Sequence, residues 1–242
     1  MAFDPPATCL SGCTACKVRH VSDWAGLPRH AAEIVSRVRV RRSLRRGATL
    51  FAPGDSNAGL YCVSSGIVGI RMAHENGTEA LIALAFPGET LGARAFLRNS
   101  PHRTTAEALT PVDLCMIQRR DALRLTQQAP EVHMALVERC LAAMDAAQTE
   151  LLHSAALSNR ARLCRFLHRL CLLDHDDEAC AVQLRLPVSR HDLAGMLGIQ
   201  PESLSRLLGK LADDGLVTLS GRHVMVASVA ALRAEAGLEP CH

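Results

Sequence analysis

The chain has 242 residues, 48% of them hydrophobic, with a formal net charge of +3 and an isoelectric point near 8.4. This length allows one large domain or two modest ones, and so mild a charge excludes a nucleic-acid binder that relies on bulk charge alone. No apolar run has the roughly 18–20 residues of a membrane span, and the first residues lack the basic and apolar parts of a signal peptide. We therefore expect a cytoplasmic protein without a membrane partner, whose ten cysteines stay mostly reduced.

Residues 1–24 form a cysteine-rich segment, and residues 25–120 are predicted to form a sensor domain. Apolar residues at helical spacing predict a lead-in helix between Gly26 and Val38. From Val40 to about Gln118, short apolar runs alternate with turn sequences, of which Asn76-Gly77 is a strong hairpin turn. Regular turns between short strands favour an antiparallel barrel or roll.

Residues 121–156 are predicted to be a dimerisation helix, because they contain no glycine and Pro130 is their one proline. Apolar positions recur there at alternating steps of three and four, as in a coiled-coil seam. The seam consists of Met134, Val137, Leu141, Met144, Gln148 and Leu151. The alternative is a helix that packs on its own barrel. Met and Gln make a weak seam, so the predicted homodimer is marginal and easily biased.

Residues 157–242 are predicted to bind double-stranded DNA. After a helix around residues 159–173 and a polar surface loop at 174–178, Ser189 is a candidate N-cap. Gly198 ends that helix and Pro201 suits the first position of the next one. Two short helices joined by a tight turn form a helix-turn-helix, and apolar runs on both sides of Gly221-Arg222 predict the two strands of a wing.

Three side chains at the start of the second helix share one predicted exposed face, because Glu202, Ser205 and Arg206 lie at i, i+3 and i+4. Arg can bond guanine through two hydrogen bonds, Glu can accept from cytosine and Ser can serve either base. The alternative is a surface salt bridge between Glu202 and Arg206. The other candidate DNA contacts are Ser189 and three basic residues that suit phosphate, Arg190, Lys210 and Arg222.

A specific family pattern covers residues 47–55, 60–66, 86–92 and 189–215. In these stretches the chain resembles the CRP/FNR family of bacterial transcription regulators. The resemblance implies an α+β fold with a cyclic-nucleotide-binding-type antiparallel β-roll, a long dimerisation helix and a C-terminal winged helix-turn-helix. It also implies a homodimer that works with double-stranded DNA and RNA polymerase.

The resemblance is to the FNR branch of this family. Glu202, Ser205 and Arg206 look like its E-x-x-S-R pattern, which implies a TTGAT-like half-site in an inverted repeat. The cyclic-nucleotide branch would have a basic residue in place of Pro201, and its phosphate-binding pattern would need Arg103 in another register. We therefore do not expect cyclic AMP as a ligand.

FNR-type oxygen sensors hold a [4Fe-4S] cluster with three N-terminal cysteines and one in the roll, and Cys13, Cys16 and Cys115 resemble three of these ligands. The usual third N-terminal cysteine is absent, so Cys9 is the predicted substitute. Thiolates suit such a cluster because iron in it takes soft anionic ligands. Attack by oxygen or nitric oxide on the cluster would then shift the weak dimer away from DNA.

Other interpretations of the cysteines remain open. The N-terminal thiols could form a thiol-redox or zinc site or an inert tail, or a haem-based gas sensor could use His20, His30, His74 or His102. A Cys-based oxidoreductase would also use Cys-x-x-Cys, but no thioredoxin-like pattern and no nucleophile–base pair accompany it, so no catalytic residues are predicted. The remaining cysteines are predicted to be core thiols, namely Cys62, Cys140, Cys164 and Cys171, or exposed bystanders, namely Cys180 and Cys241.

Overall fold

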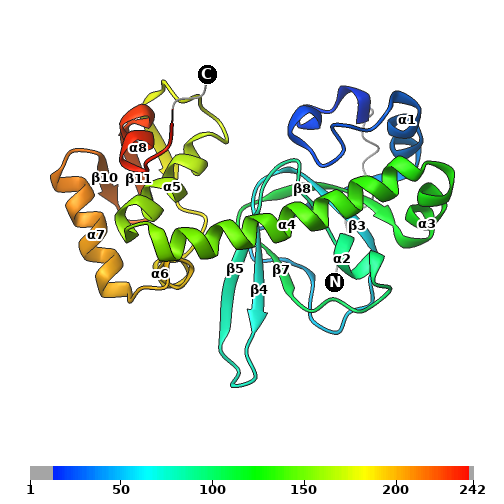
Figure 1. Ribbon diagram of the computed structural model, residues 1–242, viewed down its shortest axis with the longest axis horizontal. Helices are drawn as coiled ribbons and strands as arrows, with labels where there is room; N and C mark the ends of the chain where they lie inside the picture. Colours follow the sequence, from blue (N-terminus) through cyan, green and yellow to red (C-terminus); the bar gives the residue numbers. More distant parts are fainter. Residues whose placement is uncertain (1–12, 240–242) are drawn as a thin grey trace. The chain divides into compact units, whose positions relative to one another are not determined.

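The structure, a computed structural model, describes residues 13–239. The predicted ligand Cys9 and the predicted bystander Cys241 lie outside the described residues. Backbone contacts divide the chain into two units, one that ends at Ala146 and one that begins at Ala147 (Figure 1). The predicted boundaries between functional domains remain predictions, and each unit is described below by itself.

The first unit contains two four-stranded antiparallel sheets, with strand orders β1-β8-β3-β6 and β2-β7-β4-β5 (Figure 1). Alternate side chains such as Val63, Ala106 and Leu114 point inward and build a buried core. The predicted antiparallel roll is therefore confirmed. Its strands are β1 (Arg39–Leu44), β2 (Thr49–Phe51), β3 (Gly59–Ser65), β4 (Val68–Ala73), β5 (Glu79–Ala85), β6 (Thr90–Leu91), β7 (Thr105–Ala108) and β8 (Val112–Gln118).

The predicted hairpin turn at Asn76-Gly77 joins β4 to β5. Gly77 has a φ angle of +83°, which a residue with a side chain adopts only with strain. The Asn76 side-chain oxygen accepts a hydrogen bond from the Thr78 backbone amide at 2.9 Å. The turn therefore forms for the local reasons that its sequence indicates.

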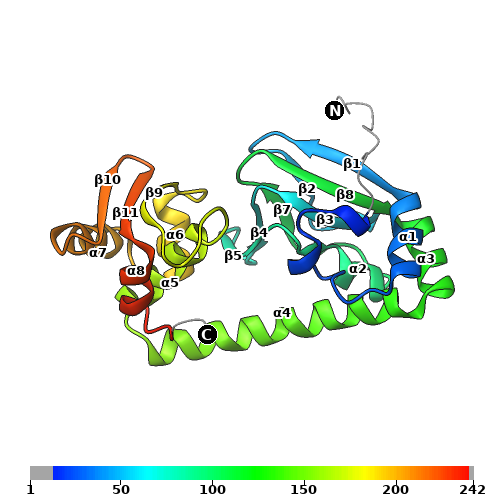
Figure 2. The same cartoon turned by 90° about the horizontal axis from the view of Figure 1, so that it is seen from above.

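Helices cover one end of the roll, where α1 lies beside α3 (Figure 2). The predicted lead-in helix begins at Arg29 instead of Gly26, because Pro28 has an extended ψ of 154°. A second core joins these helices to the sheet through Trp24, Val35 and Ile117. The helical elements are the 3₁₀ turns η1 (Cys13–Ala15) and η2 (Arg19–Val21), and the helices α1 (Arg29–Val38), α2 (Ala93–Leu97), α3 (Arg119–Gln128) and α4 (Pro130–Ala156).

The span 121–156, predicted as a single helix, contains a break. Helix α3 ends at Gln128, Ala129 has an extended conformation with φ −139° and ψ 90°, and α4 begins at Pro130. Proline restricts the preceding residue to extended backbone, and its missing amide is tolerated in a first helical turn. This correction leaves the predicted seam, which begins at Met134, entirely on α4.

The second unit is a winged helix-turn-helix around a leucine-rich core, with Leu163, Leu204 and Leu232 fully buried. Its sheet has three strands in the order β10-β11-β9, one more than the predicted wing. The elements are α5 (Asn159–Cys171), β9 (Cys180–Arg185), α6 (Arg190–Leu197), α7 (Pro201–Asp213), β10 (Val217–Ser220), β11 (His223–Ser228) and α8 (Val229–Glu235).

The turn between α6 and α7 forms as its residues predict. Ser189 caps α6 by accepting a hydrogen bond from the Asp192 amide at 3.0 Å. Gly198 ends the helix in the left-handed region, with φ +65°. The Arg162 guanidinium donates to the Leu197 carbonyl at 2.8 Å, which satisfies one of the last carbonyls of α6. These contacts fix where α7 begins.

Candidate functional site

The first candidate surface is the N-terminal half of α7. Its buried face, which includes Leu204 and Leu208, anchors the helix, while Glu202, Ser205 and Arg206 are all exposed. The Ser205 hydroxyl donates to the Pro201 carbonyl at 3.0 Å. Both charged groups therefore face solvent, as a helix that contacts base edges requires.

The basic residues near α7 differ in their contacts. Lys210 is exposed, whereas the Arg190 guanidinium donates to the Gly221 carbonyl at 3.3 Å. Arg222 donates to the carbonyls of Leu186 and Pro187, at 3.3 and 3.2 Å, and partial burial lowers the pKa of Arg190. Arg190 and Arg222 thus hold the wing turn near the start of α6, and contacts from them, Lys210 or Ser189 to phosphate remain predictions.

The second candidate surface is an apolar face of α4. Met134, Leu141, Met144 and Leu151 have exposed fractions of 53%, 52%, 57% and 71%. Gln148 is also exposed and Val137 is half-buried. The buried residues of α4 are Val132, Ala135 and Leu136, all in its first two turns. Packing on the roll therefore accounts for the start of the helix but leaves the predicted seam uncovered in this chain.

The third candidate site is a small cavity of about 40 Å³ beneath the N-terminal segment. Among the residues that the structure describes, four thiols line it, those of Cys13, Cys16, Cys62 and Cys115. The cavity is largely enclosed and mostly apolar, with Trp24 among its walls. Cys13, Cys16 and Cys115 were predicted from the sequence to act together, whereas Cys62 was predicted to be a core thiol.

Strand pairing explains why Cys62 and Cys115 lie together. They are register partners on β3 and β8, so their side chains leave the sheet on the same face. Their neighbours Val63 and Leu114 point the other way, into the roll. The Arg39 guanidinium donates to the Cys115 sulfur at 3.0 Å, which places a positive charge beside that thiol.

The N-terminal turn η1 is tied to helix α1 by a hydrogen bond. The Cys13 amide donates to the Ser36 hydroxyl of α1 at 2.7 Å. Burial, followed by the negative charges of Cys115, Asp23 and Cys16, raises the pKa of the Cys62 thiol to about 12. Within residues 13–239, no three His, Cys, Asp or Glu side chains are gathered closely enough to hold a metal ion. The four sulfurs therefore share a cavity without converging on one point.

Asp23 ties this segment to the roll and to α4. Its amide donates to the Gly88 carbonyl at 3.1 Å, and its carboxylate accepts from the Thr90 amide at 2.5 Å. The Arg139 guanidinium of α4 lies 3.3 Å from the same carboxylate and 3.0 Å from that of Glu89. Burial raises the pKa of Asp23 although Arg139 opposes the shift.

Asp23 and Arg139 were not predicted from the sequence, because an isolated Asp and a helical Arg form no recognisable pattern. Gly88 is a local indication in the sequence that another segment packs closely at this turn. It has a φ of +98°, and a side chain there would place its Cβ 2.7 Å from the Val21 carbonyl oxygen. The turn at Gly88 is thus shaped for close approach of the N-terminal segment.

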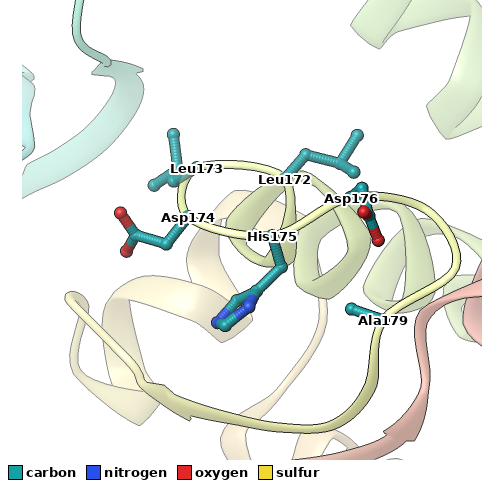
Figure 3. Close-up of a pocket in the computed structure, with 6 residues that line it drawn as sticks. All are labelled: Leu172, Leu173, Asp174, His175, Asp176 and Ala179. Carbon is teal, nitrogen blue, oxygen red and sulfur yellow. The ribbon is translucent and has the colours of Figure 1, made fainter.

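Another hollow lies in the loop between α5 and β9 of the second unit and measures about 500 Å³. It is lined by Leu172, Leu173, Asp174, His175, Asp176 and Ala179 (Figure 3). The polar side chains Asp174, His175 and Asp176 point away from one another. This confirms the predicted surface loop. Because these side chains do not point toward a common position, we do not consider the hollow a functional site.

An aromatic stack lies in the roll. The rings of Phe51 and His102 lie 3.7 Å apart, and His102 is buried. Arg103, next in the chain, is exposed. Of the histidines considered for haem, His20, His30 and His74 are also exposed.

Residues 41–129 match the family model of the cyclic nucleotide-binding domain, and residues 161–235 match that of the Crp-like helix-turn-helix domain. The nitrogen fixation regulation protein FixK of Rhizobium meliloti (strain 1021) is 32% identical over 181 residues, which are 75% of this chain and 79% of that protein. The chain belongs to the CRP/FNR family of transcription regulators.

Other CRP/FNR proteins match most of the chain. The transcriptional activator protein FnrL of Cereibacter sphaeroides is 28% identical, with 98% of this chain and 96% of that protein covered. The crystal structure of a CRP-family transcriptional regulator from Thermus thermophilus superposes with a TM-score of 0.65 at 25% identity, covering 81% of this chain and 96% of the other.

Membership of the CRP/FNR family settles two predictions. The α+β fold with roll, long helix and winged helix-turn-helix is confirmed, and the relatives are transcription regulators instead of enzymes, so the oxidoreductase alternative is dropped. A helix-turn-helix regulator of this family binds DNA. Of the helices in residues 13–239, none combines the length and the hydropathy of a membrane-spanning segment.

Proposed function

We propose that this CRP/FNR protein is a homodimer that binds a TTGAT-like inverted repeat under the control of an oxygen- or redox-sensitive [4Fe-4S] cluster. The observation that carries the sensing part is the cavity shared by Cys13, Cys16 and Cys115. Cys115 lies 99 positions beyond Cys16 in the sequence, yet the fold brings the N-terminal pair to β8.

The residues around the cavity suit an iron–sulfur cluster in their chemistry. The thiols supply soft anionic ligands once they lose their protons, and the enclosed apolar walls limit access of water. The Arg39 guanidinium places a positive charge beside Cys115, which suits an anionic sulfur ligand at that position. A bound cluster would supply a centre that is sensitive to oxygen or nitric oxide. In the sequence-based prediction the fourth thiolate comes from Cys9.

Asp23 gives such a site a physical link to the dimer helix. Ser22 and Trp24 line the cavity, and Asp23 between them contacts Arg139 of α4. A change in the position of the N-terminal segment therefore alters an ion pair on the helix that presents the apolar seam. Since that seam is weak, a small bias suffices to shift the dimer equilibrium.

The DNA-binding part of the proposal follows from α7. A dimer with two-fold symmetry presents two copies of Glu202, Ser205 and Arg206, which matches an inverted repeat. RNA polymerase is the proposed partner on DNA. The buried stack of His102 on Phe51 and the exposed Arg103 support the absence of cyclic AMP as a ligand.

The proposal is tested by anaerobic purification followed by reconstitution with iron and sulfide. We expect visible absorption from a cluster, equal amounts of iron and sulfide, and binding to a TTGAT palindrome that is lost when air is admitted. Protein treated with a chelator under nitrogen serves as the control. A colourless, iron-free product after reconstitution would refute cluster-based sensing.

The ion pair between Arg139 and Asp23 leads to a separate prediction. We expect Arg139→Ala to retain wild-type iron content but to lose most of the change in dimer affinity between anaerobic and aerated protein, because the contact to Asp23 is removed. Sedimentation in both atmospheres measures the effect. Arg124→Ala, an exposed arginine of α3, is the matched control. A wild-type oxygen response in Arg139→Ala would exclude this route.

A further inference from the structure

Cys62 shares the thiol cavity, although the sequence placed it in the core. We infer that Cys62, and not Cys9, supplies the fourth thiolate of the cluster. This inference rests on the proposed function, since it assigns a ligand to the same site. It also replaces a residue outside the described part of the chain by one whose position the structure gives.

The surroundings of Cys62 differ from those of the core cysteines. Cys164 and Cys171 are fully buried in the second unit, whereas Cys62 is half-buried and faces the cavity. Cys140 packs against the same core as Cys62 but does not line the cavity. Among the described cysteines, a place on the cavity wall thus selects the two sheet thiols and the N-terminal pair.

The two strands fix the spacing of the sheet thiols. Cys62 and Cys115 are direct register partners, so they leave adjacent strands side by side on the face opposite the roll core. The N-terminal pair, Cys13 and Cys16, lines the same cavity from the turn η1 and the residue that follows it. Two thiols from the sheet and two from the N-terminal segment would make the cluster a bridge between these two parts.

Both the sheet ligands and the N-terminal ligands of such a cluster would be connected to Arg139 of α4. Val63, next to Cys62, donates its amide to the Glu89 carbonyl at 3.0 Å and accepts from the Gly88 amide at 2.8 Å. Glu89 in turn pairs with Arg139. Cys62 is therefore adjacent in the sequence to a residue that is hydrogen-bonded to the turn that contacts the dimer helix. The N-terminal ligands are connected to the same arginine through Asp23.

Ligation requires each thiol to release one proton to water as its sulfur–iron bond forms, with no change in the oxidation state of the sulfur. Because the cavity measures only about 40 Å³, binding of a four-iron cluster would require the turn η1 to move outward. That movement disturbs little of the core, because η1 contains no buried residue. Its main anchor is the hydrogen bond from Cys13 to Ser36.

The full chain, reconstituted anaerobically with ferrous iron and sulfide, tests the assignment. We expect Cys62→Ser to lower the affinity for the cluster by at least about tenfold, with loss of iron, sulfide and visible absorption. Cys9→Ser should retain them, and so should the control Cys140→Ser, whose thiol lies outside the cavity. Thermal unfolding of each apoprotein verifies folding. Tight binding by Cys62→Ser with loss in Cys9→Ser would overturn the inference and leave the proposed function standing.

A second measurement needs no variant and holds even if Cys62→Ser fails to fold. In the wild-type holoprotein, iodoacetamide should alkylate Cys9 without loss of visible absorption, because Cys9 holds no iron. Protection of Cys9 by the cluster would overturn the inference. Wild-type protein that takes up no iron at all, or that instead forms a disulfide between cavity cysteines, would reject the inference together with cluster-based sensing.

Discussion

Arg206→Ala is expected to weaken binding to a TTGAT palindrome by about 1–3 kcal/mol for each half-site contact that is lost. The exposed guanidinium lies on the same face of α7 as Glu202 and Ser205, and the helix is held in place by buried leucines. Arginine can bond guanine O6 and N7 together, which alanine cannot replace. Fluorescence anisotropy with labelled duplexes at one fixed salt concentration measures the loss.

The control for Arg206→Ala has to separate base recognition from loss of charge. Arg29→Ala removes the same charge from α1 of the first unit and should leave DNA affinity unchanged. A duplex with the guanine of each half-site replaced supplies the second comparison, since Arg206→Ala should bind both duplexes almost equally. If the variant loses equal affinity for specific and random duplexes, Arg206 contacts phosphate and the base assignment is wrong.

Local sequence rules predicted the helix-turn-helix because its ends depend on single residues. Ser189 and Gly198 each act through one backbone contact or one φ angle, so their effect is visible in the sequence. Strand β9 was not predicted, because its own pattern is too short. In β9 only Val182 and Leu184 are buried, and a strand with two inward residues has too short an alternation to recognise.

At the thiol cavity, too, local features could be predicted from the sequence and features that depend on strand pairing could not. The spacing of Cys13 and Cys16 is local and was predicted to be functional. The contribution of Cys62 depends on its pairing with Cys115, 53 positions along the chain, and register is set by the whole sheet. One clue was present in the sequence: strand alternation places Cys62 on the face opposite its apolar neighbours Tyr61 and Val63.

The apolar face of α4 leads to the second large effect, in Leu141→Glu. In the proposed dimer, Leu141 lies at the middle of the seam, and its exposed fraction of 52% in the single chain leaves its area to be buried by a partner. Two-fold symmetry places the substituted residues of both chains near each other. Each uncompensated buried charge costs about 3–5 kcal/mol, which exceeds what a weak seam contributes.

We therefore expect Leu141→Glu to be a monomer under nitrogen at concentrations where the wild type is a dimer, as measured by sedimentation, and to lose affinity for the palindrome. Its cluster should persist, because Leu141 does not line the thiol cavity. Leu123→Glu is the matched control, since Leu123 is an exposed leucine of α3 away from the seam. A dimeric Leu141→Glu protein would mean that α4 does not form the interface, whereas a monomer without its cluster would mean that the substitution disturbs the roll itself.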